Sequence, residues 1–260
     1  MPAPRFLTLE DGGKLAYHKV SPDCPDATPG VIFLGGFKSD MGGAKALFLD
    51  DYCRAHNLPF VRFDYCGHGQ SSGKFTEGTI GGWAQDALAI LDHAADAGRQ
   101  HILVGSSMGG WVMLLAALAR PERVAGLLGI ASAPDFTETL IWDALPPEDR
   151  LKLQQEGVFH LPSEYCNDPA PDPYPITLQL IKEARRHLLL RGENPIPIMC
   201  PVRLLHGMAD KDVPCETSLT LARKLAGAEV TVTLLKGAGH RMSEPAQLAA
   251  LVREMEAFAL

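Results

Sequence analysis

The stretch His101–Ala119 constrains the fold more than any other part of the sequence. It begins with a short apolar run, passes through Gly105-Ser106-Ser107-Met108-Gly109, and continues over Trp111–Ala119 without a glycine, proline or charged residue. The run is typical of a buried strand and the segment after it of a helix. Glycines on both sides of a serine allow a turn too tight for side chains. The sequence therefore predicts a strand joined to a helix by a sharp turn with Ser107 at its apex.

Similar short apolar runs, rich in branched residues, recur along the chain and alternate with segments of helical period. We expect about eight strands, the first two forming a hairpin around Asp11-Gly12-Gly13. They are Arg5–Leu9, Lys14–Val20, Val31–Leu34, Phe60–Asp64, His101–Gly105, Val124–Ile130, Val202–His206 and Val230–Leu235. Apolar residues share one helical face at 83–94 and again at 248–258. This alternation predicts an α/β fold with a mostly parallel sheet flanked by helices.

The segment 135–197 interrupts this alternation, and we predict that it is a small helical lid inserted after the sixth strand. Residues 1–134 and 198–260 would then form the core. Pro146-Pro147 and Pro175 are placed to start two helices, with a loop over Asp168–Pro175 between them. The segment has more apolar side chains than a linker needs: Leu140, Ile141, Trp142, Leu145, Val158, Phe159, Leu161 and Tyr165. Such a lid would cover an apolar pocket.

The composition limits the partners and the compartment of the protein. The 260-residue chain has a formal charge of −7, and its 24 Lys and Arg are scattered, so no basic patch for nucleic acid is expected. The longest nearly charge-free apolar stretch, Met108–Ala119, is too short to cross a membrane. The N-terminus contains Glu10 and Asp11 and no long apolar segment. We therefore expect a cytoplasmic protein without a signal or transit peptide.

The six cysteines are spread along the chain without a Cys-x-x-Cys pair. This spacing favours neither a disulfide framework nor a zinc site. We expect mostly reduced thiols and no bound metal.

Ser107 is a candidate nucleophile, because the turn would lift its hydroxyl above the sheet. A serine hydroxyl needs a base, and the base needs an acid that orients it. Asp210 follows the strand Val202–His206, and His240 follows Val230–Leu235, so both would lie at the carboxyl edge of the sheet. The order Ser107, Asp210, His240 is that of a known hydrolytic triad.

Other acidic residues could take the place of Asp210. Asp212 lies two residues further on, although a surface or helix-capping position suits it better. Asp135, just after the sixth strand, is a further candidate, whereas Asp64 is expected to tie down its own loop.

The residues around Ser107 predict an oxyanion hole and a pocket. The N–H of Met108 at the start of the helix and the N–H of Phe37, after Gly35-Gly36, are the expected donors. Among the histidines, His206 is expected to be structural, and His68 and His160 to line a pocket. Candidate substrate contacts are Gly36, Lys38, His68, Trp142 and Phe159.

Five stretches together resemble the α/β-hydrolase family across almost the whole chain: 35–37, 63–71, 105–110, 206–214 and 239–240. In more detail, the segments around them are similar to the mitochondrial α/β-hydrolase domain family of palmitoyl-protein thioesterases and acyl-glucuronide esterases. The resemblance implies hydrolysis of acyl thioesters and carboxylic esters without a cofactor, by Ser107, Asp210 and His240. Because this chain shows no transit peptide, we expect a bacterial-type cytoplasmic relative.

The sequence thus predicts a serine hydrolase that cleaves small-molecule esters or thioesters through an acyl-enzyme. An acylated protein is a further candidate substrate, and a monomer or homodimer is expected. A non-catalytic binding or scaffold protein on the same fold is the main alternative, because fold does not fix function. A C–C hydrolase or an acyltransferase also remains open. Serine at position 107, where aspartate would be needed, disfavours dehalogenase and epoxide hydrolase chemistry.

Overall fold

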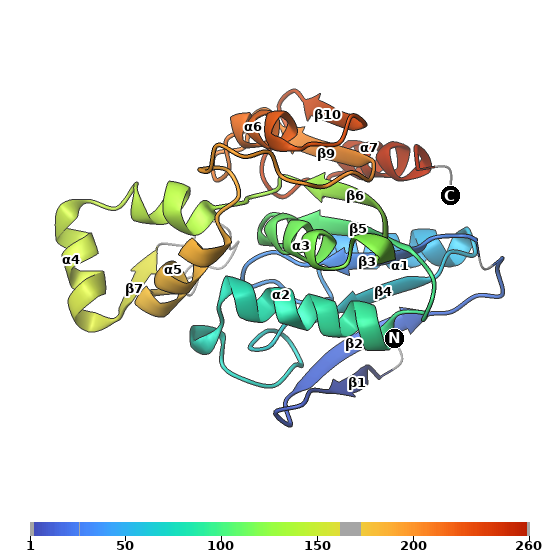
Figure 1. Ribbon diagram of the computed structural model, residues 1–260, viewed down its shortest axis with the longest axis horizontal. Helices are drawn as coiled ribbons and strands as arrows, with labels where there is room; N and C mark the ends of the chain where they lie inside the picture. The colour runs from blue at the N-terminus through green and yellow to red at the C-terminus, as the bar shows by residue number, and fades with distance from the viewer. Residues whose placement is uncertain (1–2, 26, 162–172, 259–260) are drawn as a thin grey trace.

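An eight-stranded sheet forms the centre of the structure (Figure 1), a computed structural model that describes residues 3–25, 27–161 and 173–258. The strand order is β1-β2-β4-β3-β5-β6-β9-β10. Strand β2 is antiparallel to both its neighbours, and the remaining pairs are parallel. The strands are β1 (Arg5–Thr8), β2 (Lys14–Val20), β3 (Gly30–Leu34), β4 (Phe60–Phe63), β5 (His101–Ser106), β6 (Val124–Ile130), β9 (Val202–Gly207) and β10 (Val230–Leu235). The predicted α/β fold with a mostly parallel sheet is confirmed.

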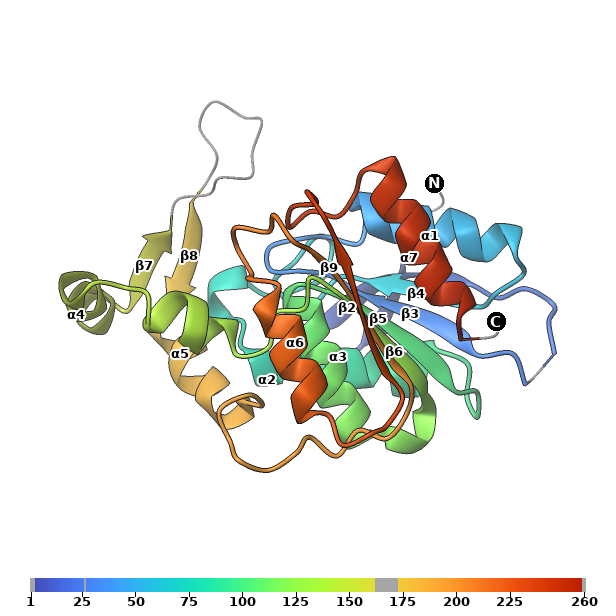
Figure 2. The ribbon, with the colours of Figure 1, turned by 90° about the horizontal axis from the view of Figure 1, so that it is seen from above.

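Helices cover both faces of this sheet (Figure 2). One face carries α2 (Ile80–Ala89), α3 (Met108–Ala119) and α6 (Glu216–Lys224), and the other carries α1 (Ala44–Ala55) and α7 (Pro245–Glu256). Successive residues of a strand point to opposite faces. Ile32 and Leu34 therefore join the apolar cluster under α2 and α3, whereas Val31 and Phe33 join the one under α1 and α7. Helix α2 continues as one π-helical turn, Ile90–Ala94.

The insertion between β6 and β9 extends beyond one end of the sheet (Figures 1 and 2). It contains a π-helical segment (Thr137–Trp142), α4 (Pro147–Glu156), β7 (Val158–Leu161), β8 (Tyr174–Thr177) and α5 (Leu178–Ala184). Strands β7 and β8 form a two-stranded antiparallel sheet, so the insertion contains a hairpin, which is not predicted, beside its helices. Pro175 lies in β8, and α5 begins only after Thr177, whose side chain accepts a hydrogen bond from Leu180 N. That this segment acts as a lid remains a prediction.

Asp135 joins the two ends of the insertion. It is fully buried, has a φ of +60°, and its carboxylate accepts hydrogen bonds from the N–H groups of Leu189 and Leu190, both at 2.8 Å. Burial raises the pKa of Asp135, and these two bonds act in the opposite direction. Asp135 thus connects the point where the insertion leaves the core with the point where it returns.

The five described cysteines are free thiols: Cys24, Cys53, Cys66, Cys200 and Cys215. Burial raises the pKa of Cys53 to about 12. Cys166 lies outside the described residues, as do Tyr165 and most of the predicted loop Asp168–Pro175.

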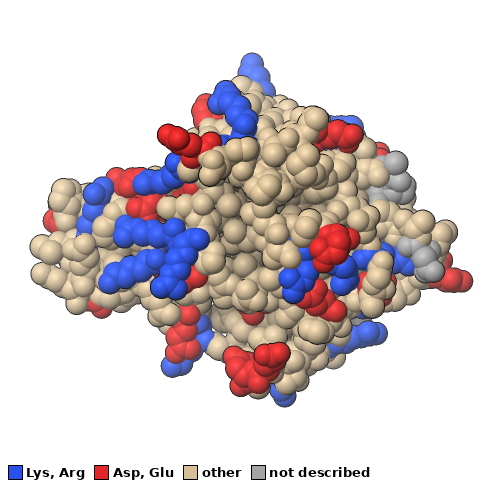
Figure 3. Space-filling view, in the orientation of Figure 1, with Lys and Arg blue, Asp and Glu red and all other residues tan. Residues whose placement is uncertain are grey.

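The face shown in Figure 3 carries charged side chains of both signs and wide uncharged areas, and a group of Lys and Arg gathers on its left, over the insertion. Within the described part of the chain, the structure contains no helix with the length and apolarity needed to span a bilayer.

A buried ion pair attaches helix α1 to the sheet. Arg62 on β4 donates from Nε to Asp50 Oδ2 on α1 at 2.7 Å and from a second nitrogen to the Met41 carbonyl at 2.8 Å. Arg54, one turn along α1, also donates to Asp50. Burial alone would raise the pKa of Asp50, but the hydrogen bonds from Arg62 and Arg54 lower it below its ordinary value.

We expect Asp50→Asn to lower the free energy of unfolding at pH 7 by about 3–5 kcal/mol, because it leaves Arg62 buried without a counter-charge. The folded-state pKa is lowered, so the stabilisation is complete above the unfolded-state pKa and is lost as pH falls through the folded-state pKa. Urea unfolding from neutral to acidic pH checks this, with Asp51→Asn, at an exposed position of α1, as the matched control. A difference between Asp50→Asn and wild type that does not shrink in acid would contradict it.

Candidate active site

Ser107 is held in a strained conformation between β5 and α3. Its φ is +54° and its ψ −118°, a region that residues other than glycine rarely adopt. Its N–H donates to the Ile130 carbonyl at 2.9 Å, and its carbonyl accepts from Gly110 N at 2.8 Å and Ala133 N at 3.1 Å. Bonds to β6, to α3 and to the residues after β6 therefore fix the strained residue on three sides.

The two glycines flanking Ser107 are required by close backbone contacts. A Cβ on Gly105 would lie 2.4 Å from the Gly109 carbonyl oxygen, and a Cβ on Gly109 would lie 2.1 Å from the Leu34 carbonyl oxygen. The first turn of α3 thus packs directly on the loop that follows β3. This contact brings the start of α3 next to Gly36, whose added Cβ would lie 3.5 Å from Ser107 Cβ.

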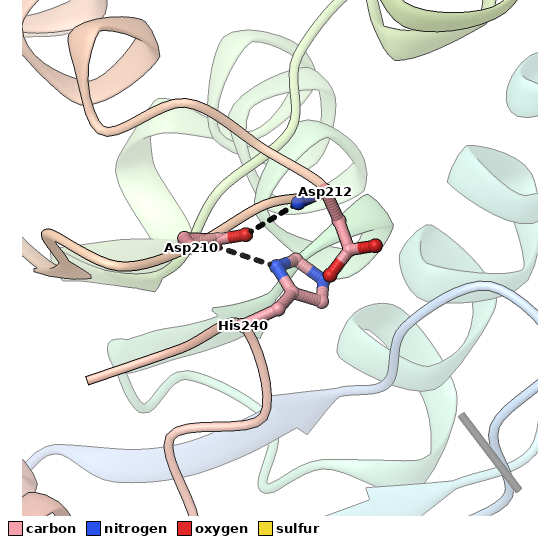
Figure 4. A group of neighbouring side chains, drawn as sticks. All are labelled: Asp210, Asp212 and His240. Atoms are coloured by element: carbon pink, nitrogen blue, oxygen red, sulfur yellow. Dashed lines mark hydrogen bonds and ion pairs between the residues drawn. The ribbon is translucent and has the colours of Figure 1, made fainter. Parts of the chain in front are cut away.

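The structure brings the three predicted residues of the triad together. His240 Nε2 lies 3.0 Å from Ser107 Oγ, and His240 Nδ1 lies 2.8 Å from Asp210 Oδ2. Asp210 lies in the loop after β9 and His240 in the loop after β10, and Figure 4 shows the two side chains facing each other. Ser107, His240 and Asp210 therefore form one continuous chain of hydrogen bonds.

The side chain of Asp210 is buried and accepts hydrogen bonds at both oxygens. Its Oδ1 accepts from Asp212 N and Val213 N, both at 2.9 Å, and its Oδ2 faces His240 and His206, the latter at 3.1 Å. Burial alone would raise the pKa of Asp210, but the hydrogen bonds from the two histidines and from Val213 lower it well below its ordinary value. Asp210 is consequently ionised at neutral pH, as an acid that orients a histidine must be.

His206 is fully buried behind the triad. Its Nε2 faces two acceptors, Asp210 Oδ2 and the Val213 carbonyl at 2.9 Å, and its Nδ1 lies 2.7 Å from Ser218 Oγ. The proton is therefore on Nε2, and Ser218 donates to Nδ1. The structural role expected of His206 agrees with these contacts.

The alternative acids have other partners. Asp212 contributes its N–H to Asp210, and it does not cap α6, whose N-cap is Cys215. Asp135 bonds the end of the insertion, and Asp64 accepts from Gln70 N in its own loop. Asp210, Asp212 and His240 bring one possible metal-ligand atom each within 4.8 Å of one another (Figure 4). Both oxygens of Asp210 already accept hydrogen bonds, so we assign this group to the triad.

A cavity of 510 Å³ opens at Ser107. Its lining includes apolar residues, most of them from the insertion: Ala133, Phe136, Leu140, Ile141, Leu161, Tyr174 and Ile176. It also includes polar residues from the core: Ser39, Lys45, Asp212, Arg241 and Ser243. Gly36, Phe37, Met108 and His240 line it together with Ser107. The cavity thus combines apolar side chains of the insertion with polar side chains of the core.

Only some of the predicted pocket residues line this cavity. Gly36 does, but Trp142 does not, and its ring centre lies 5.8 and 4.8 Å from the guanidinium groups of Arg150 and Arg185. Phe159 packs beside Ile176 in the β7–β8 ladder without lining the cavity, and His160 is exposed. Composition identifies such residues as apolar or polar but does not give the direction of their side chains.

Lys38 and His68 also lie outside the cavity lining. The Lys38 ammonium lies 5.6 Å from the ring centre of Tyr174, and the buried His68 accepts a hydrogen bond from Lys38 N. His68 thus holds the loop 36–39 through a backbone N–H, and Lys38 contacts the insertion.

Lys45 and Arg241 are two charged residues of the cavity lining that the sequence does not predict. Lys45 donates to the Arg241 carbonyl, and burial together with the nearby Arg241 charge lowers the pKa of Lys45 to about 8. The position of Lys45 in the first turn of α1 gives no signal, because that helix itself is not predicted. Arg241 directly follows the candidate base, and this proximity in sequence could have indicated it.

The fold is that of a known family of proteins. The model of the alpha/beta hydrolase family matches residues 31–251. The chain belongs to the alpha/beta hydrolase family.

Within this family the chain is similar to palmitoyl-protein thioesterase ABHD10, mitochondrial. It is 43% identical to the Homo sapiens protein over 95% of this chain and 77% of that one. The solved mouse alpha/beta hydrolase domain-containing protein 10 is 40% identical, with a TM-score of 0.88 over 99% of this chain and 98% of that one. A solved Agrobacterium vitis protein is 37% identical, with a TM-score of 0.91 over 99% of each chain. The predicted family resemblance is confirmed.

The expected cytoplasmic location is wrong by the same comparison. The mammalian relatives, 42–44% identical, carry names that place them in mitochondria. The expectation rested on the composition of the N-terminal residues alone, and these indicate a compartment only where they include the targeting segment.

We expect Gly109→Ala to lower the free energy of unfolding by about 1–3 kcal/mol, because the added Cβ would press on the Leu34 carbonyl. The same shift should displace Ser107 and slow its labelling by a fluorophosphonate. Gly192→Ala is the matched control, because nothing lies within 4 Å of a Cβ added there. Urea unfolding and labelling rates test the prediction, and equal behaviour of the two variants would refute it.

Proposed function

We propose that the protein hydrolyses carboxylic esters or acyl thioesters through an acyl-enzyme formed on Ser107. The observation that carries the proposal is the chain of contacts from Ser107 Oγ through His240 to the buried Asp210, open to a cavity at one end. A protein that only binds ligands has no use for a strained serine aligned with a histidine and a buried acid. The geometry therefore favours the enzyme over the scaffold.

In the acylation step, Ser107 Oγ bonds to the acyl carbon while its proton moves to His240 Nε2, 3.0 Å away. The electron pair of the carbonyl bond moves to the oxygen. When the tetrahedral intermediate collapses, the bond to the alcohol or thiol breaks, and His240 returns the proton to that leaving group. Asp210 keeps the imidazole oriented and stabilises its positive charge.

Deacylation repeats these steps with water. His240 takes a proton from water as the oxygen attacks the acyl carbon, and it then protonates Ser107 as the acid leaves. In both steps we assign the oxyanion to the N–H groups of Phe37 and Met108, two residues that line the cavity together with Ser107. The start of α3 adds its helix dipole to this charge stabilisation.

The residues that line the cavity suggest what it binds. Its apolar side chains, most of them from the insertion, suit an acyl chain, and the polar Lys45 and Arg241 suit the leaving group. The mammalian relatives are named palmitoyl-protein thioesterases, and on that basis acylated proteins join small esters and thioesters as candidate substrates. In this arrangement the insertion serves as a lid.

We expect Ser107→Ala to abolish hydrolysis of p-nitrophenyl esters and of an acyl thioester, since the nucleophile is gone. Asp210→Asn should lower kcat by about 10⁴-fold, because the histidine loses its orientation and charge partner. Steady-state rates over a series from acetate to palmitate, with fluorophosphonate labelling of Ser107, provide the measurement.

The control for these variants is Ser21→Ala, at an exposed position after β2. Unchanged activity in Ser107→Ala, or no activity and no labelling in the wild type, would refute the proposal and favour a binding protein.

A larger apolar side chain in the part of the insertion that lines the cavity should shorten the acyl chain that the enzyme accepts. Leu140 lines the cavity from the π-helical segment of the insertion. We expect Leu140→Trp to lower kcat/KM for an octanoate ester by about tenfold or more and to spare the acetate ester, since overpacking removes space for the chain. Leu151→Trp on α4, where leucine is 52% exposed, is the matched control. Equal losses for both esters would argue against an acyl site there.

A further inference from the structure

The loop after β4 packs against the loop that carries Phe37. Two side chains of this segment, Asp64 and His68, bond backbone N–H groups of the neighbouring loop. Asp64 Oδ1 accepts from Met41 N at 2.6 Å, and His68 Nε2 accepts from Lys38 N at 3.2 Å. Neither residue lines the cavity at Ser107, so the proposed reaction leaves both without a role.

The hydrogen bonds of His68 define one tautomer. Its Nδ1 faces the Cys66 carbonyl oxygen at 3.3 Å and must carry the proton, because a carbonyl only accepts. Its Nε2 is then the free acceptor that the Lys38 N–H requires. Burial lowers the pKa of His68, and the bond to Cys66 acts in the opposite direction. The ring is therefore neutral at neutral pH and can serve as an acceptor.

Packing holds this ring in place. His68 is only 4% exposed, and the rings of Phe75, Trp83 and Tyr65 stand edge-on around it at 5.0, 5.3 and 5.6 Å. Trp83 also donates from Nε1 to the Cys66 carbonyl at 3.1 Å. The acceptor atom therefore has a fixed position relative to α2 and to the core.

The bond to His68 fixes one of the two peptide groups that flank Phe37. The other, between Gly36 and Phe37, is fixed by Ser39 N, which donates to the Gly36 carbonyl at 3.1 Å. A peptide group is planar, so its carbonyl and its N–H are oriented together. With both planes held, and Lys38 in a left-handed conformation at φ +57°, the Phe37 N–H has one direction.

The glycines on either side of His68 are required by the same packing. Gly67 has a φ of +78°, and a Cβ there would lie 2.7 Å from Phe75 N. Gly69 has a φ of +47°, and a Cβ there would lie 2.1 Å from Asp64 Oδ2. The Gly-His-Gly sequence thus allows the histidine to reach across to the loop of Phe37.

We propose that His68 is a positioning residue for the oxyanion hole: its Nε2 holds the Lys38 N–H and thereby aims the Phe37 N–H at the oxyanion. The proposal rests on the function proposed above. It also explains the 63–71 motif, which has no other part in the reaction.

Two substitutions separate this role from simple packing. In His68→Gln the side-chain oxygen reaches the position of Nε2 and still accepts from Lys38. In His68→Asn the shorter amide replaces Nδ1, so it keeps the bond to Cys66 and loses the one to Lys38. His56→Asn, at an exposed position just after α1, is the matched control.

For His68→Asn we expect kcat per active site to fall about 10- to 100-fold, less than the roughly 10²–10³-fold loss on removing an oxyanion donor outright. We expect KM to stay within about twofold, because the bond acts on the transition state. His68→Gln should stay within about threefold of wild type in kcat. Active-site titration with a fluorophosphonate supplies the number of competent sites. Equal losses in both variants, or a loss explained by fewer competent sites, would overturn the proposal.

Hydrogen exchange of the Lys38 amide, followed by NMR on the full ¹⁵N-labelled chain, gives a second readout that does not depend on turnover. The amide should be protected in wild type and His68→Gln and exchange quickly in His68→Asn. Protection that persists in His68→Asn overturns the positioning role even if the enzyme is active. If the wild type cleaves no acyl substrate while the exchange pattern is as expected, the proposed function fails and the contact stands.

Discussion

The strained backbone at Ser107 is the constraint on which the rest of the site depends. A positive φ at a serine persists only where the neighbouring structure leaves no alternative. Here Gly105 and Gly109 have no side chain, so the backbone around Ser107 packs closely on itself and on the Leu34 carbonyl. That contact places the nucleophile, the first turn of α3 and the loop after β3 in one small volume. The loops after β9 and β10 then need only reach this point, as they do with Asp210 and His240.

Buried carboxylates join the loops around this point. Asp50 holds α1 to the sheet through Arg62, Asp64 holds the loops after β3 and β4 together, and Asp135 closes the insertion. Asp210 ties its own loop to the triad histidine. Each accepts two or more hydrogen bonds, which is the condition for burying a carboxylate. The edge of the sheet that carries the site is therefore held by charge-assisted bonds, whereas the layers behind it are held by apolar packing.

The sequence predicts best those elements in which an apolar run is bounded by turn residues. All eight strands of the large sheet lie within about one residue of their expected ranges, because buried strands are short apolar runs bounded by turn residues. The triad followed from chain order and strand ends. Helix α1 and the β7–β8 hairpin were missed, and Pro175 was misleading, since proline suits an edge strand as well as a helix start. Trp142 is predicted to line the pocket, but its ring packs against Arg150 and Arg185, and an apolar pattern does not indicate which way a side chain points.

Because Asp135 joins the two ends of the insertion, the insertion can differ between related proteins that share the core. Because one buried carboxylate holds the strand exit and the returning Leu189 and Leu190 together, the sheet meets the whole insertion as a loop whose ends are already joined. Lengthening such a loop costs little further entropy. The segment can therefore be exchanged during evolution, or grafted by design, without moving the strands beneath it, and substrate range can change independently of the catalytic apparatus.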